Sequence, residues 1–190
     1  MALREKAKQD GEPILRDKSF EILLKMVSKY KPKKILEIGV NLGLSSIGML
    51  MTEQSAHLTG IEIAEEKIIL AKENYKLFKV NERAKIFQGD ASEIIPILTG
   101  EYDFIFLDGP KGHYYEYLPH LLAVLKVGGI LFADNVLFRG YVGDKVKTPH
   151  RFATTKHSME NFLKEITESP NLKTEIIDIE DGLSITEKLR

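Results

Sequence analysis

The sequence contains no cysteine, which excludes disulfide bonds, thiolate zinc sites, iron–sulfur clusters and a cysteine nucleophile. It also lacks any apolar run that approaches the roughly 20 residues needed to cross a bilayer. Charges run through the first residues, where a secretory signal would have an apolar stretch. We therefore expect a cytoplasmic protein that does not enter a membrane, with any metal held by oxygen or histidine ligands.

A large charge of one sign is absent as well, since the 190 residues carry a formal net charge of −1. This balance excludes a uniformly basic coat for nucleic acid, although a local patch stays open. Residues 1–34 hold ten basic and five acidic side chains, and residues 139–156 hold five basic and one acidic. The two basic stretches therefore lie on an acidic body. On charge alone, solvated surface is the simpler interpretation of both.

Short β-rich runs alternate with stretches of helical periodicity along the chain. Strands are expected over residues 34–40, 57–63, 84–90, 102–108, 129–136, 172–179 and 183–187. Helices are expected around 20–27, over 43–54, from 65, over 92–98, over 114–125 and around 159–166, with a long loop over 137–153. This order predicts an α/β fold with a Rossmann-like, doubly wound sheet of seven strands that ends in an antiparallel hairpin.

The length suits one domain, residues 1–190, with a helical segment over 1–33 and the sheet core over 34–190. In a sheet of this kind, ligands bind beyond the carboxyl ends of the strands. The residues that follow each strand are therefore the candidate site.

The first strand leads into Gly39 and Gly43, which let the backbone turn tightly and approach a ligand, although glycines at such turns also serve packing. Their G-x-x-x-G spacing matches neither the dinucleotide fingerprint nor a P-loop, and this disfavours a dehydrogenase. Glu37 lies inside the apolar strand, where a carboxylate needs compensation by a cationic ligand or a hydrogen-bond network.

Acidic residues also follow the next two strands. Glu62 is placed to hydrogen-bond ribose hydroxyls, or else to cap a helix. Asp90, between Gly89 and Ala91, could accept a hydrogen bond from an adenine amino group, act as a helix N-cap, or do both.

Oxygen side chains end the fourth and fifth strands, at Asp108, Asp134 and Asn135. A single aspartate there is commonly a turn or cap residue. Two carboxylates at neighbouring strand tips repel each other unless a hard cation neutralises them. So few ligands, all of them oxygen, favour magnesium over calcium.

Taken together, these motifs resemble the magnesium-dependent, S-adenosylmethionine-dependent O-methyltransferases, the family of the catechol and caffeoyl-CoA methyltransferases. The resemblance covers nearly the whole chain and includes the ILEIGVNLGLSS run, the Gly-Asp-Ala run, Asp-x-x-Lys and Asp-Asn-Val. Residues 133–140 and 181–188 look more particularly like the bacterial transfer-RNA 5-hydroxyuridine methyltransferases.

The resemblance implies a class I methyltransferase fold, S-adenosylmethionine and Mg²⁺ as cofactors, and a homodimer. It implies magnesium at Asp108, Asp134 and Asn135, with Lys111 as the general base. A lysine desolvated beside the metal would have a lowered pKa. The residues it places at the cofactor are Leu15, Glu37, Gly39, Gly43, Ser45, Glu62, Gly89, Asp90, Ala91 and Asp108.

The acceptor stays open between two classes. A cation with two free positions suits vicinal oxygens, which both catechols and 5-hydroxyuridine possess. The basic stretch over 139–156 favours tRNA, with Phe138 stacking on a base or simply packing, and with Arg139 and Arg151 near phosphate. The leading prediction is methylation of 5-hydroxyuridine at the tRNA wobble position to 5-methoxyuridine. The alternative is a small catechol-like or caffeoyl-CoA-like phenol. The complete strand-tip set argues against a third interpretation, a cofactor- or RNA-binding protein without catalysis.

Overall fold

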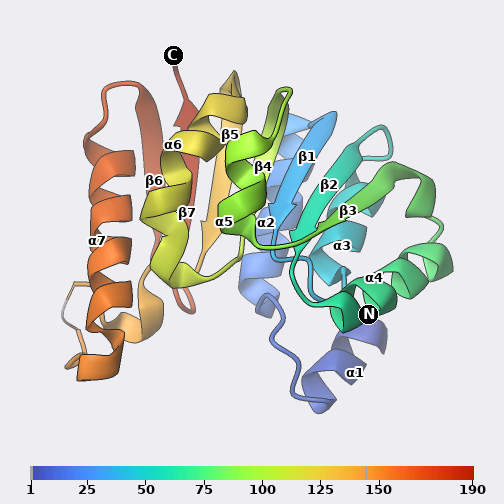
Figure 1. Cartoon of the computed structure of the whole chain (residues 1–190), viewed down its shortest axis with the longest axis horizontal. Coiled ribbons are helices and arrows are strands. Elements are labelled where there is room, and N and C mark those ends of the chain that lie inside the picture. Colours follow the sequence, from blue (N-terminus) through green and yellow to red (C-terminus); the bar gives the residue numbers. More distant parts are fainter. Residues whose placement is uncertain (1, 144) are drawn as a thin grey trace.

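The computed structural model describes residues 2–143 and 145–190. Its centre is a seven-stranded sheet with the order β3-β2-β1-β4-β5-β7-β6 (Figure 1). The strands are β1 (Lys34–Ile38), β2 (His57–Glu62), β3 (Ala84–Gln88), β4 (Tyr102–Leu107), β5 (Leu125–Asp134), β6 (Leu172–Ile177) and β7 (Leu183–Lys188). The helices are α1 (Ala2–Gln9), α2 (Asp17–Tyr30), α3 (Leu44–Thr52), α4 (Glu65–Leu77), α5 (Ala91–Ile94), α6 (Tyr114–Val124) and α7 (Ala153–Glu168).

Only β7 runs against the other strands, because it pairs antiparallel with both β5 and β6. The predicted doubly wound sheet with its terminal hairpin is therefore confirmed. Among the described residues, no helix is both long and apolar enough to cross a membrane.

Helices cover both faces of the sheet, so the central strands are apolar on both sides. In β4, Phe104 and Phe106 pack with α2, α3 and α4, whereas Ile105 and Leu107 pack with α5, α6 and α7. This two-sided burial explains why the strand is a continuous apolar run instead of an alternating one.

The fifth strand differs from its predicted bounds. It begins at Leu125, four residues before the expected start, because Leu125 already pairs with Tyr102 of β4. A register irregularity follows, and the strand then resumes at Ile130. Gly128 and Gly129 lie inside this irregular part, where residues without side chains tolerate the distortion. The pair therefore belongs to the strand and does not separate it from α6.

The predicted loop over 137–153 is also more ordered than expected. Short 3₁₀ turns occupy Phe138–Gly140 and His150–Phe152, and α7 begins directly after the second. Asp144, the acidic residue of the basic stretch, lies outside the described residues.

Candidate functional site

A cavity of about 590 Å³ lies at the carboxyl ends of β1, β2, β4 and β5. The predicted residues that line it are Gly39, Glu62, Asp108, Lys111, Asp134 and Asn135. A pocket of about 100 Å³ adjoins it and brings in Gly89, Asp90 and Ala91. A narrower pocket of about 20 Å³ brings in Leu15 and Ser45. The residues predicted from separate strand ends thus meet at one edge of the sheet.

Gly39 is what allows the ends of β1 and β4 to approach each other. Its φ is +90°, and a Cβ at this position would overlap the carbonyl oxygen of Asp108. Its N–H donates to Ile61 O at 3.0 Å, and the N–H of Asp108 donates to Ile38 O at 3.0 Å. Only glycine combines this backbone conformation with such a close contact.

The carboxylate of Glu62 is fixed at the mouth of the cavity. It accepts backbone N–H bonds from Asn41 at 2.8 Å, from Ile63 at 2.9 Å and from Ala64 at 3.0 Å. These bonds tie the loop after β1 to the end of β2 and leave a further lone pair on Oε2. The side chain therefore has the placement that a ribose-binding carboxylate needs.

Asp90 is the N-cap of α5, which confirms the predicted capping role. Its Oδ1 accepts the backbone N–H of Ser92 at 2.8 Å, and this bond lowers the pKa of Asp90. The same residue lines the small pocket, so capping and ligand contact are compatible at this position.

Glu37 is completely buried below the cavity instead of lining it. Ser46 Oγ donates to Glu37 Oε2, and the hydroxyl of Tyr75 donates to Ser46 Oγ at 2.6 Å. Burial raises the pKa of Glu37 to about 8 against the effect of the Ser46 bond, and the charges of Asp108 and Glu62 raise it further. Glu37 Oε1 has no partner among the described residues. Burial therefore favours the protonated carboxyl, which the Ser46 bond holds in place, and a cofactor contact stays a prediction.

Gly43 is not among the lining residues, although its neighbours Leu42 and Leu44 line the narrow pocket. It precedes α3 as its N-cap, and a Cβ there would overlap the ring of Tyr75. Close packing of α3 on α4 accounts for this glycine, and its predicted cofactor contact is likewise untested by the geometry.

The candidate metal ligands Asp108 and Asp134 lie at the paired ends of the neighbouring strands β4 and β5. Leu107 of β4 pairs with Ala133 of β5, so Asp108 and Asp134 follow side by side. The hydroxyl of Tyr114 donates to Leu107 O at 3.0 Å and to Asp134 O at 3.3 Å, which braces both strand ends. Burial raises the pKa of Asp134, and the charge of Asp108 adds to that effect.

These residues fit magnesium by their donor chemistry. Two carboxylates and the amide of Asn135 present only hard oxygen ligands. Among the described residues, no group of three or more histidine, cysteine or acidic side chains could hold a metal, so the candidate set has only two carboxylates beside the amide of Asn135. Three protein ligands would leave positions of a six-coordinate cation for substrate and water.

Lys111 contacts the carboxylate pair of Asp108 and Asp134 through Asp108, with Nζ 2.7 Å from Asp108 Oδ1. Burial alone lowers the pKa of Lys111, but the oxygens of Tyr114, Asp108 and Asp134 outweigh it and raise the pKa above its ordinary value. The lowered pKa expected from the sequence is thus not what these protein residues produce. A base role for Lys111 needs the carboxylates to be neutralised first.

The predicted acceptor residues form an aromatic cluster. The ring centroid of Phe138 lies 5.5 Å from that of Tyr141 and 5.6 Å from that of Phe152. The guanidinium carbons of Arg139 and Arg151 lie 5.5 Å and 4.8 Å from the Phe152 centroid. Phe138 therefore packs within the protein, and none of the three predicted residues is among those that line the cavity.

The segment around Leu15, which the family resemblance placed over the cofactor, borders the cavity. We call residues 13–16 the strap, since Pro13, Ile14 and Arg16 line the large cavity and Leu15 the narrow pocket. Asn41 Nδ2 donates to Pro13 O at 2.8 Å, and Lys67 Nζ pairs with Glu12 at 2.7 Å. These two anchoring contacts join distant parts of the chain, and the sequence did not indicate them.

The fold and the cavity define a class I methyltransferase. The O-methyltransferase family model matches residues 5–189, and the chain belongs to this family. It is an S-adenosylmethionine-dependent O-methyltransferase, which confirms that level of the prediction.

Three relatives illustrate the similarity. Caffeoyl-CoA O-methyltransferase of Medicago sativa is 27% identical over 190 residues, which cover 89% of this chain and 71% of that protein. The crystal structure of a Staphylococcus aureus protein, provisionally named a caffeoyl-CoA O-methyltransferase, is 28% identical with a TM-score of 0.90 and covers 98% of this chain and 90% of that one. The SAH-bound Podospora anserina methyltransferase PaMTH1 is 24% identical with a TM-score of 0.82 and covers 92% and 80%.

Proposed function

We propose that the enzyme holds Mg²⁺ with Asp108, Asp134 and Asn135 and methylates one of two vicinal oxygens on a small phenol of the catechol or caffeoyl type. The observation that carries this proposal is the pair of carboxylates on adjacent strands, in the same cavity as the ribose-type carboxylate of Glu62. Donor and acceptor sites then share one cavity, as direct methyl transfer requires.

We assign each part of the methyl donor to a different pocket. The small pocket at Asp90 and Ala91 takes the adenine, and Glu62 takes the ribose. The narrow pocket at Leu15 and Ser45 takes the methionine end. This arrangement directs the sulfonium methyl towards the strand tips at Asp108.

Bound magnesium would lower the pKa of the acceptor hydroxyl and orient it. Residues of the chain would accept the hydroxyl proton and hold the site in shape. Asp108 holds Lys111 Nζ beside the acceptor position, at 2.7 Å from its own carboxylate. Neutralisation of the carboxylates would let Nζ release its own proton to solvent, and the neutral amine could then take up the hydroxyl proton. Tyr114 keeps the two strand ends together.

Two observations favour a small phenol over tRNA. Arg139 and Arg151 both lie over Phe152, and Lys145 forms an ion pair with Asp178, so much of the basic stretch is engaged within the protein. The relatives named above include caffeoyl-CoA O-methyltransferases, whereas none of them is named for tRNA. We therefore favour the small phenol, the alternative acceptor, over 5-hydroxyuridine in tRNA.

The test is an acceptor panel with purified enzyme, labelled S-adenosylmethionine and Mg²⁺. We expect methylation of catechol-type and caffeoyl-type acceptors, and no methylation of analogues in which one of the two vicinal oxygens is missing. The panel includes tRNA that carries 5-hydroxyuridine. Transfer to that tRNA alone, impaired by Arg151→Glu, would restore the tRNA prediction and overturn the present proposal.

A further inference from the structure

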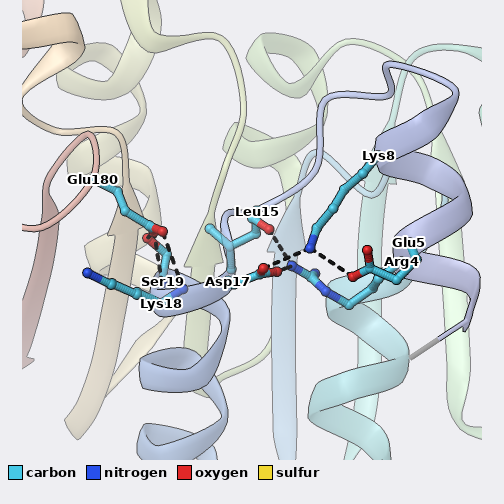
Figure 2. Close-up of polar contacts among 8 residues, drawn as sticks. All are labelled: Arg4, Glu5, Lys8, Leu15, Asp17, Lys18, Ser19 and Glu180. Atoms are coloured by element: carbon cyan, nitrogen blue, oxygen red, sulfur yellow. Dashed lines mark hydrogen bonds and ion pairs between the residues drawn. The ribbon is translucent and has the colours of Figure 1, made fainter.

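Helix α2 begins without a capping side chain of its own, because its N-cap residue Arg16 makes no side-chain hydrogen bond. The carboxylate of Glu180 takes this place from the turn between β6 and β7. Its Oε1 accepts the N–H of Lys18 at 3.3 Å, and its Oε2 accepts the N–H of Ser19 at 3.0 Å and the hydroxyl of Ser19 at 2.6 Å (Figure 2). A carboxylate here satisfies orphan donors and complements the helix dipole.

The first turn of α2 continues directly into the strap. Arg16 is both the N-cap of α2 and a lining residue of the large cavity, and Leu15 is buried against the narrow pocket. The position of this helix end therefore sets where the strap crosses the cofactor cavity.

Helix α1 holds the same turn from its other side, as Figure 2 shows. Arg4 Nη2 donates to Leu15 O at 2.6 Å and to Asp17 Oδ1 at 3.0 Å, and Lys8 Nζ donates to Asp17 Oδ2 at 2.7 Å. Asp17 is largely exposed, so water competes for these ion pairs. Ser19 is only 1% exposed, so its N–H and hydroxyl would lose their partner without a replacement if Glu180 were removed.

Residues 180–182 are themselves firmly attached to the acceptor side of the site. The backbone oxygens of Asp181 and Gly182 accept the N–H groups of Leu137 at 2.9 Å and Val136 at 3.0 Å. These two donors follow the candidate ligand Asn135 directly. Glu180 has a φ of +53°, which a residue with a side chain adopts at a cost. The carboxylate is thus presented to α2 from a fixed turn.

We propose that Glu180 is a positioning residue for cofactor binding, which acts through buried Ser19 in the first turn of α2 to hold the strap over the methyl-donor cavity. This inference rests on the cofactor site of the proposed function. It predicts that loss of the carboxylate weakens cofactor binding although Glu180 itself does not line the cavity.

The test is calorimetric titration of the full chain with S-adenosylhomocysteine, for wild type, Glu180→Ala, Glu180→Gly and the control Glu175→Gln. Glu175 is an exposed glutamate on the same hairpin. Both Glu180 variants should raise the dissociation constant about tenfold, because a lost helix cap costs about this factor in stability and the cofactor would then have to order the turn itself. The KM for S-adenosylmethionine should rise equally, while kcat at saturating donor stays near wild type. The control should match wild type.

The glycine variant keeps the test decisive if the alanine variant unfolds, because glycine adopts the left-handed backbone of residue 180 without strain. Ser19→Ala should give a smaller loss, because it removes only the hydroxyl bond to Glu180 and keeps the two backbone bonds. Its combination with Glu180→Ala should add little, since the second change already removes that hydroxyl bond. Folded Glu180 variants that bind S-adenosylhomocysteine like wild type would overturn the inference alone. A wild-type protein that fails to bind it would overturn the proposed cofactor site and the inference with it.

Discussion

Replacement of Glu37 by glutamine tests whether a neutral carboxyl lies beneath the cofactor site. Burial raises the pKa of Glu37 from 4.5 to about 8, and the residue is fully buried. The folded protein therefore favours the protonated form, whereas the unfolded chain ionises near the ordinary value. The stabilising contribution is complete below a pH of about 4.5 and is lost as the pH rises towards about 8. Glutamine stays neutral at every pH and accepts the same bond from Ser46.

The magnitude follows from these two pKa values. Between about pH 5.5 and about pH 8, the ionisation of Glu37 should lower the free energy of unfolding of the wild type by about 3 kcal/mol relative to Glu37→Gln. Urea denaturation of the cofactor-free proteins, followed by circular dichroism, measures both values at both pH conditions. The change in the exposed residue Glu21→Gln is the control and should leave the pH dependence of the wild type unchanged.

A constant difference between wild type and Glu37→Gln across this pH range would refute the reasoning. It would mean that Glu37 is ionised in the fold, and that its unpartnered Oε1 has a cationic neighbour or water instead of a proton.

Three further predictions concern the cavity and the core. Gly39→Ala should abolish S-adenosylhomocysteine binding in calorimetry, because its Cβ would overlap Asp108 O at a φ of +90°; unchanged affinity would contradict the close-approach argument. Phe162→Ala should lower the free energy of unfolding by roughly 3–5 kcal/mol in urea, since the ring is fully buried, and a loss below about 1 kcal/mol would show that the core collapses around it. Lys111→Met should lower kcat by about 10²–10⁴-fold with an unchanged KM for the methyl donor, and a wild-type kcat would exclude the base role.

The sheet and the strand-tip residues could be predicted because both follow from local patterns and one rule of geometry. Apolar runs mark the strands, and parallel strands present their carboxyl ends at one edge. Asp108 and Asp134 are therefore brought together by topology, although 26 positions separate them in the sequence. The start of β5 escaped prediction because its pairing partner, Tyr102, decides it.

The strap and its anchor could not be predicted in this way. Glu180 binds Ser19 across 161 positions, and neither residue belongs to a recognisable motif. The sequence could not give the pKa of Lys111 without a metal for a related reason, since the sum of burial and three neighbouring oxygens decides it. The lowered pKa expected beside a metal stays a prediction. The homodimer and the cytoplasmic location stay predictions.

Metal dependence of methyl transfer to a catechol-type acceptor tests the central claim most directly. The initial rate is measured after EDTA treatment and then during titration with Mg²⁺, for wild type and for Asp134→Asn. We predict a background rate in EDTA, full recovery of the wild type with Mg²⁺, and a requirement for more Mg²⁺ in the variant, which loses one of two carboxylate ligands. A full wild-type rate in EDTA would contradict the proposed magnesium site.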